Sequence, residues 1–434
     1  MDSFQKFFEK EYSKALCYKK VNIAGILFID YFQDYYGIWE RDELKKRIKN
    51  IIKFFLILLP FKKKIRYNIL NENKYFKLLF LLNSDVEAIN NKTKILESLI
   101  PKFKKNDILL ITFSKKIYLK YKNQDFNIIY ISFWKWTLKF QIIKKVKFKY
   151  LIKALNICHT IDVYENILEK YKIDLVLTTQ DHEPLDYSLT MLAKEKKIKT
   201  ISHQHALFIE DAGYEYYYSD YLMLWGERSI EFLARKAIKK NCFIVGTNKY
   251  NFLLQYRKIK KRKLVLCMTN NGNEYAEMKL INKFNDLPFE NGEKVIKLHP
   301  SIDKKDFIKK YKNIKNNIKI SMGYSEIIEA KYLLTYQTTA FLDGLFCGAS
   351  VLNICIDELK ENKIPCKIKY ENIDEELLKR ESDKIYFDKI LRLQEEELKK
   401  QILYTNSEIR EKKIIDQILE KNYINFEEEK ENVK

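Results

Sequence analysis

Apolar and polar positions along the chain predict strands and helices in turn. Short apolar runs of strand type are followed by stretches with helical spacing, most regularly after residue 170. The strands predicted in that part span residues 173–178, 198–202, 220–225, 243–245, 264–268, 295–298, 319–321, 332–334 and 351–354. Strands that alternate with helices are typical of parallel βαβ units, so the pattern predicts an α/β protein.

The chain before residue 170 is less regular. Strands are expected at residues 21–29, 108–112 and 128–131, and two helices at 148–158 and 163–171. Residues 1–20 and 31–53 have helical spacing, whereas the apolar run 54–59 suits a buried strand or a buried helix equally. No strand is assigned between residues 60 and 107.

The two series of strands predict two Rossmann-like domains that face each other across a cleft, with extra helices at the C-terminus. At 434 residues the chain is long enough for both domains. We divide it into residues 1–240, 241–372 and a charged helical segment with a solvated tail, 373–434. In open α/β sheets, ligands bind beyond the carboxyl ends of the strands, so polar residues there are the candidate site.

Composition narrows the expected location and partners. The chain is 46% hydrophobic and carries 80 Lys+Arg against 59 Asp+Glu, a net charge of +21. Part of this lysine excess is a compositional bias, and the remainder favours an anionic membrane surface, a nucleotide, an acidic glycan or a nucleic acid. The seven cysteines show no metal-binding spacing and are expected to be reduced, as in a cytoplasmic protein. The N-terminus lacks the apolar core of a signal peptide, and the apolar run 54–61 is too short to cross a bilayer.

The stretch 329–354 predicts a strand, a tight turn, a helix and a second strand. Gln337, Thr338 and Thr339 interrupt the first apolar run, and helical spacing begins after them. Gly348 stands where a C-cap glycine belongs. The threonine pair can cap the helix, or it can offer hydroxyls to an anion beside the positive end of the helix dipole. Both interpretations remain open at this point.

Histidines follow several of the predicted strands. His203 and His205 come directly after the strand at 198–202, and His299 with Pro300 follows the strand at 295–298. Each histidine alone suits an ordinary structural role. Together, beyond strands that point into one cleft, they suit proton transfer or phosphate binding. His203 and His205 lack a third ligand at a suggestive spacing, so no metal site is expected.

Other polar loops lie at predicted strand ends. Glu210 and Asp211 precede Gly213, where they can cap a turn or act as a general base. Gly246 and Thr247 follow the strand at 243–245, and Asn270 and Asn271 follow the strand at 264–268. The latter loop can cradle phosphate, although it matches neither GxGxxG nor a Walker loop.

An ordered set of segments resembles a known family. The segments are SHQHALF, YYYSDYLMLWGE, FIVGTNKYN, LVLCMTNN, KLHPSID and EAKYLLTYQTTAFLDGLFCGASVLNI. In this order they resemble GT-B glycosyltransferases of the bacterial surface-polysaccharide group. That group includes capsule polysaccharide transferases, polysialyltransferases and CDP-glycerol glycerophosphotransferases. The resemblance covers roughly residues 170–356.

The resemblance implies a role for individual residues. The His-Pro motif falls on His299 and Pro300, and the Ser/Thr motif on Thr338 and Thr339, so both sets would contact the donor phosphate. Gly246, Thr247, Asn270, Asn271, Gln337 and Asp343 complete the implied donor site. The acceptor-activating base would be His203 or His205. The acidic motif of the polysialyltransferases falls on Glu210 and Asp211, but Ala212 separates them from Gly213, so an acid or a histidine can be the base.

These features predict a metal-independent, inverting glycosyltransferase. The first domain would bind a glycan or glycolipid acceptor and the second a CMP-, CDP- or UDP-linked sugar, which is a substrate, so no cofactor is expected. The expected product is a surface glycan such as capsule or lipooligosaccharide, made by a cytoplasmic protein with peripheral contact to the inner membrane surface. The alternatives are a nucleotide-sugar 2-epimerase of the same architecture, an inactive docking partner, and a basic nucleic-acid-binding protein, for which no motif is visible.

Overall fold

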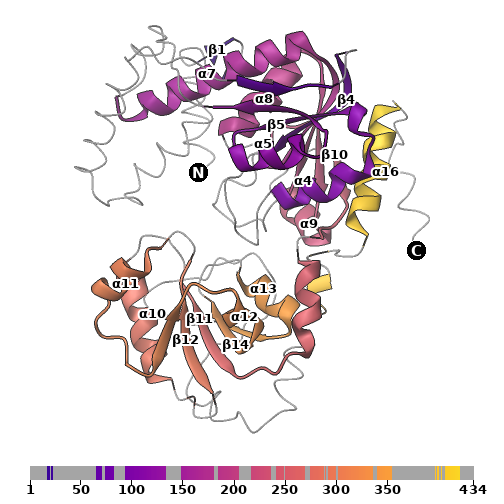
Figure 1. Ribbon diagram of the computed structural model, residues 1–434. Coiled ribbons are helices and arrows are strands. Elements are labelled where there is room, and N and C mark those ends of the chain that lie inside the picture. The colour runs from indigo at the N-terminus through magenta and orange to yellow at the C-terminus, as the bar shows by residue number, and fades with distance from the viewer. Residues whose placement is uncertain are drawn as a thin grey trace.

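The structure is a computed structural model with an α/β fold and two sheets (Figure 1). The described residues are 17–19, 21–22, 65–70, 74–82, 93–132, 148–179, 184–204, 217–235, 241–248, 250–268, 274–287, 289, 292–299, 302–335, 340–353, 396, 398–399, 402 and 406–420. The first sheet is built from strands up to residue 244 and the second from strands after residue 262. A small antiparallel ladder joins β1 (Cys17–Tyr18) to β2 (Val21–Asn22).

The first sheet has eight strands in the order β10-β9-β8-β7-β4-β5-β6-β3. Neighbouring strands are parallel except β3, which runs antiparallel to β6 at the edge. Its strands are β3 (Ile65–Asn68), β4 (Tyr75–Leu82), β5 (Ile108–Thr112), β6 (Asn127–Ile131), β7 (Lys172–Thr178), β8 (Lys199–His203), β9 (Tyr221–Leu224) and β10 (Asn241–Ile244).

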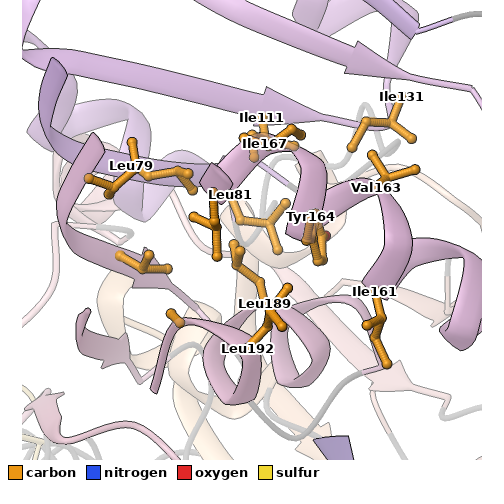
Figure 2. Close-up of a cluster of buried hydrophobic side chains, with 14 of the residues drawn as sticks. Leu79, Leu81, Ile111, Ile131, Ile161, Val163, Tyr164, Ile167, Leu189 and Leu192 are labelled. Atoms are coloured by element: carbon orange, nitrogen blue, oxygen red, sulfur yellow. The ribbon is translucent and has the colours of Figure 1, made fainter. Parts of the chain in front are cut away.

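Helices cover both faces of this sheet. On one face, α7 (Phe148–Lys170) and α8 (Pro184–Glu195) pack on the strands; Figure 2 shows Tyr164 and Ile167 of α7 with Leu189 and Leu192 of α8 around Leu79 and Leu81. The other face carries α4 (Thr93–Leu99), α5 (Lys115–Lys122) and the last described helix, α16 (Ser407–Leu419). Burial on both faces explains the nearly continuous apolar runs of the central strands.

Two expectations for this part were wrong. The apolar run YFKLLFLL forms β4, which lies between β5 and β7 at the middle of the sheet, although no strand was assigned there. The helices expected at 148–158 and 163–171 are one continuous helix, α7. His159 and Thr160, which lie between the two predicted helices, are buried within it. The regions expected to be helical at 1–20 and 31–53, and the run 54–59, fall largely or wholly outside the described residues.

The second sheet has five parallel strands in the order β13-β12-β11-β14-β15. The strand predictions after residue 260 are confirmed to within a few residues. The strands are β11 (Lys263–Cys267), β12 (Glu293–Lys297), β13 (Ile318–Ser321), β14 (Ala330–Thr335) and β15 (Ser350–Asn353). On one face lie α10 (Glu274–Asp286) and α11 (Lys304–Lys310), and on the other η3 (Asn251–Lys258), α12 (Ser325–Ile328) and α13 (Ala340–Cys347).

The segment from β14 to β15 has the expected strand–helix–strand form. Helix α13 begins at Ala340, directly after the predicted cap residues, and Gly348 follows it with φ +83°. The amide of Gly348 donates to the Leu345 carbonyl, which confirms the predicted C-cap glycine. Within α13, Gly344 lies so close to β14 that a Cβ there would stand 2.5 Å from Leu333 Cδ2. The helix is therefore held tightly on the strand that precedes it.

Aromatic side chains pack together where the chain connects the first sheet to the second. Strand β10 belongs to the first sheet, which therefore runs past the predicted division at residue 240. Trp225, at the end of β9, lies edge-on to Tyr250, and Tyr250 stacks on Phe346 of α13 with ring centroids 4.9 Å apart. Trp225 is fully buried among side chains of the second sheet's core. These contacts join the two halves of the chain.

Candidate functional site

The second sheet has a topological switch point between β11 and β14. From β11 the chain proceeds through β12 and β13 on one side, then returns to place β14 and β15 on the other. In sheets of this kind the ligand crevice lies beyond the carboxyl ends of the two strands at the switch point. Cys267 of β11 is level with Lys297 of β12 and with Thr335 of β14, so the three strands end side by side.

His299 lies two residues beyond the end of β12, at this edge. Its side chain is exposed, and its backbone carbonyl accepts a hydrogen bond from the Ile302 amide at 2.9 Å. Partial desolvation of the ring, together with the Lys297 ammonium, lowers the pKa of His299 below its usual value. The lowered pKa favours the neutral form of the ring, which carries one N–H donor and one acceptor nitrogen.

Lys297 is a residue at this edge that the sequence analysis missed. Its ammonium lies close enough to His299 to depress that pKa, and it donates to the Leu298 carbonyl at 3.3 Å. It adds a positive charge where the resemblance implies a donor phosphate. The signal was present in the sequence, because residues i and i+2 of a strand lie on the same face.

The remaining donor-site predictions fall mostly outside the described residues. Pro300, Asn270, Asn271, Gln337, Thr338 and Thr339 are in this group. The strands that precede them, β12, β11 and β14, are the three that end level with one another. Their roles stay predictions.

Asp343 is described and is buried in the first turn of α13. Burial raises the pKa of both Tyr324 and Tyr250, and the Asp343 carboxylate raises each pKa further. The carboxylate therefore lies close to the two phenol groups, inside the domain. Its predicted contact with donor stays a prediction.

Two buried lysines of the second domain have structural partners. The Lys294 ammonium donates to the carbonyls of Phe284, Asn285 and Leu287 at the end of α10, and burial lowers its pKa to about 8. Lys263 pairs with Glu326 at 2.7 Å. Burial alone would raise the pKa of Glu326, but hydrogen bonds from Lys263 and Lys319 lower it. Both lysines stabilise the fold and neither is a candidate for substrate binding.

The first sheet has its own switch point, between β4 and β7. Strands β5 and β6 extend the sheet to one side of it, and β8, β9 and β10 to the other. The loops that follow β4 and β7, residues 83–92 and 180–183, lie outside the described residues. Strand β8, which carries His203 at its end, is the neighbour of β7 and so lies beside this switch point.

His203 has both ring nitrogens engaged by the protein. The side chain is 1% exposed; Nδ1 lies 2.8 Å from the Gln204 carbonyl oxygen and Nε2 lies 3.0 Å from Glu411 Oε1 of α16. A carbonyl oxygen only accepts hydrogen bonds, so Nδ1 carries a proton. In this arrangement neither nitrogen of His203 is free to receive a proton from an acceptor.

The backbone and the side chain of Gln204 are both held by hydrogen bonds. The backbone N–H of Gln204 donates to the Met223 carbonyl, and the side-chain oxygen accepts from the Trp225 backbone N–H and the Ser229 hydroxyl, both at 2.8 Å. The end of β8 is therefore locked to β9 and to α9 (Glu227–Arg235). His205, Glu210 and Asp211, the other predicted bases, lie outside the described residues.

Gly246 and Thr247 lie in the passage that leaves β10. Gly246 has φ +82°, which a glycine adopts without strain, and its amide donates to the Leu224 carbonyl at 3.0 Å. Thr247 is fully buried. They lie at the carboxyl edge of the first sheet, and their predicted contact with the donor stays a prediction.

Neither a metal site nor a membrane-spanning helix is found among the described residues. No group of three or more His, Cys, Asp or Glu side chains in them is placed to hold a metal ion. None of their helices combines the length and apolar character needed to cross a bilayer. Cys17, Cys158, Cys242, Cys267 and Cys347 are free thiols.

Comparison with solved structures identifies the fold. No family model and no curated protein matches the chain. UDP-GlcNAc 2-epimerase from Neisseria meningitidis, bound to UDP-GlcNAc, is similar at TM-score 0.52 and 14% identity, covering 80% of this chain and 100% of that one. A putative UDP-N-acetylglucosamine 2-epimerase from Listeria monocytogenes is similar at TM-score 0.54 and 11% identity, covering 80% and 98%.

Solved glycosyltransferases also match at lower scores. The wall teichoic acid polymerase TagF matches at 11% identity over 88% of this chain and 99% of that one. Its TM-score of 0.46 is too low to support a conclusion. The fold is of the GT-B type, with two Rossmann-like domains, as predicted. At these identities the similarity extends to the fold and no further.

Proposed function

We propose that this protein is a glycosyltransferase that moves a sugar from a nucleotide-activated donor to a glycan or glycolipid acceptor. The observation that carries the proposal is the edge of the second sheet. Three parallel strands end level there, His299 and Lys297 add a neutral imidazole and a positive charge, and α13 begins five residues after β14. A nucleotide phosphate needs such partners.

The reaction requires two separate kinds of help. A base takes the proton of the acceptor hydroxyl, whose oxygen then forms a bond to the anomeric carbon of the donor sugar. The bond from that carbon to the phosphate oxygen breaks, and the nucleoside phosphate leaves with the electron pair. His299 and the hydroxyls of Thr338 and Thr339 would stabilise the departing charge, and attack opposite the leaving group would invert the configuration.

The structure reduces the number of candidates for the general base. Because both ring nitrogens of His203 are engaged, we favour His205, Glu210 or Asp211 over His203. The imidazole of His205 suits proton transfer near neutral pH, and a carboxylate suits it when its pKa is raised. The acceptor would be a capsule or lipooligosaccharide chain at the inner membrane surface, which the net charge of +21 favours.

Ligand-induced stabilisation tests the proposal. The melting temperature is measured with CMP-, CDP-, UDP- and GDP-linked sugars, and a selective donor should raise it by mass action. The selected donor is then incubated with candidate glycan acceptors, and release of the nucleoside phosphate is followed. Donor turnover that depends on acceptor, with inverted configuration in the product, is expected. No stabilisation by any nucleotide sugar would contradict the proposal.

A nucleotide-sugar 2-epimerase is the second candidate. The two epimerase structures described above are similar at TM-scores of 0.52 and 0.54, so the fold suits this activity equally. An epimerase needs no acceptor. Conversion of a UDP-linked sugar to its 2-epimer by the protein alone, followed by proton NMR, would establish the epimerase instead of the transferase.

A further inference from the structure

The buried pair of His203 and Glu411 joins residues 208 positions apart in the chain. Glu411 comes from α16, which follows the second domain in sequence but packs on the first sheet through Ile415 and Ile418 (Figure 1). The two side chains are 1% and 2% exposed. One end of His203 is thus held by the returning helix and the other by the backbone of its own strand end.

The Gln204 carbonyl can only accept, and an ionised Glu411 carboxylate could also only accept, so the two contacts fix the number of protons that the pair shares. Nδ1 donates to the Gln204 carbonyl, so the contact between Nε2 and the Glu411 carboxyl group needs a second proton between them. That proton lies either on Nε2, as an imidazolium beside a carboxylate, or on Glu411, as a carboxylic acid beside a neutral ring. The pair is neutral in either case, as a buried site requires.

Stability alone does not explain this pair. The second carboxyl oxygen, Glu411 Oε2, is buried and has no hydrogen-bond partner in the part of the chain that the structure describes. Burying such a group opposes folding, and buried ionic pairs are often no better for stability than apolar side chains of the same size. A role in fixing one conformation is the best-attested alternative for such a pair.

The position of the pair shows what it would fix. Through the ring, Glu411 holds the carbonyl of Gln204, the residue that directly precedes His205. The neighbouring Arg410 donates through Nε to the Val245 carbonyl at 2.8 Å, where the chain leaves the first sheet. Two successive residues of α16 therefore hold two segments of the first domain. Glu411 holds the end of β8, before the proposed bases, and Arg410 holds the start of the connection to the second domain.

We propose that Glu411 is a positioning residue for the transfer reaction: through His203 it sets the backbone that presents the proposed base. This inference rests on the proposed function for its kinetic consequence and on the structure alone for the contact. Glu411 does not touch the substrate. Its loss should weaken acceptor use while the donor site in the second domain continues to bind nucleotide.

Ring-nitrogen NMR tests the contact without reference to activity. With histidine-selective 15N labelling, wild-type His203 should give a protonated Nδ1 signal and an Nε2 signal shifted by the Glu411 carboxyl group, strongly if the ring is an imidazolium and less if Nε2 accepts from the carboxylic acid. In Glu411→Gln, a weaker amide donor replaces the carboxyl group, and the Nε2 signal should move to that of an ordinary neutral ring. Glu408→Gln, which removes the same charge one turn earlier on α16, should leave both signals unchanged. Identical His203 signals in all three proteins would overturn the contact.

Kinetics then test the positioning. In Glu411→Gln we expect kcat at saturating acceptor to fall at least fivefold, because a misplaced base slows proton transfer, with the nucleotide-induced melting shift unchanged and Glu408→Gln like wild type. The double variant His203→Leu/Glu411→Leu, which fills the space with apolar groups, guards against simple unfolding. It should melt near the wild-type temperature and still show the lowered kcat. An unchanged kcat in both Glu411 variants would overturn the proposal.

The two proposals can fail separately. If wild-type protein transfers no sugar, the proposed function fails, and hydrogen exchange at Gln204 replaces the kinetic measurement. Its amide, which donates to the Met223 carbonyl, should exchange at least tenfold faster in Glu411→Gln than in Glu408→Gln. Equal exchange in the two variants would show that Glu411 does not fix this strand end.

Discussion

His203 and His299 occupy matching places in the two sheets, and their surroundings differ completely. His203 is the last residue of β8 and His299 lies two residues beyond β12, and each of these parallel strands is next to a switch-point strand. His203 is buried, and its ring joins a backbone carbonyl to a helix from the far end of the chain. His299 is exposed, and its lowered pKa keeps the ring neutral. Similar positions in the two sheets thus hold a buried histidine in one domain and an exposed one in the other.

The largest expected difference between the two histidines is in stability. His203→Ala leaves the Glu411 carboxyl group buried without a partner, so the free energy of unfolding should fall by about 3–5 kcal/mol. His299→Ala removes an exposed side chain and should change it by less than about 0.5 kcal/mol. Urea denaturation of both variants provides the measurement. Equal losses would remove the distinction between a buried and an exposed histidine.

The second difference concerns nucleotide affinity. A hydrogen bond to a charged phosphate contributes about 1.5–3 kcal/mol, and 1.4 kcal/mol corresponds to a factor of ten. His299→Ala should therefore raise the Kd for the selected nucleotide about tenfold or more by isothermal titration calorimetry. Glu411→Gln serves as the matched control in the first domain and should bind as wild type does. Weaker binding in the control alone would reverse the assignment of the two sites.

The smallest expected difference is in the pH dependence of stability. Because the folded pKa of His299 lies below its unfolded value, the unfolded chain binds more protons between the two values. Stability therefore falls as the pH decreases from the unfolded value, near 6.5, to the folded pKa. The variant His299→Gln lacks this contribution and should lose less stability than wild type between pH 7.5 and 5.5. An equal or greater loss in the variant, measured by thermal unfolding, would contradict the lowered pKa.

The sequence predicted the second domain well because its elements obey local rules. Three features there depend only on neighbours in sequence. They are the strands with clear apolar runs, Gly348 at a helix end, and the strand–helix–strand segment around α13. The middle strand β4 was missed because a run of Leu, Phe and Tyr that is buried on both faces lacks the alternation that distinguishes a strand. Its position is decided by the sheet that surrounds it.

The environment of His203 was beyond local pattern, because its partner lies 208 residues away. One signal was available. In α16 the residues Ser407, Glu411, Ile415 and Ile418 share the buried face, so a carboxylate stands among apolar positions of an amphipathic helix. A charged residue on such a face needs a partner. The pattern indicates that a partner exists, but the fold decides that it is His203.

The return of α16 to the first sheet has a practical consequence for dissecting the molecule. A fragment that ends at residue 248 would contain every strand of that sheet, yet it would leave bare the apolar surface that Ile415 and Ile418 cover. Such a fragment should aggregate when expressed alone. A synthetic peptide of residues 406–420, added in trans, should restore its solubility, whereas the same peptide carrying Ile415→Asp should not.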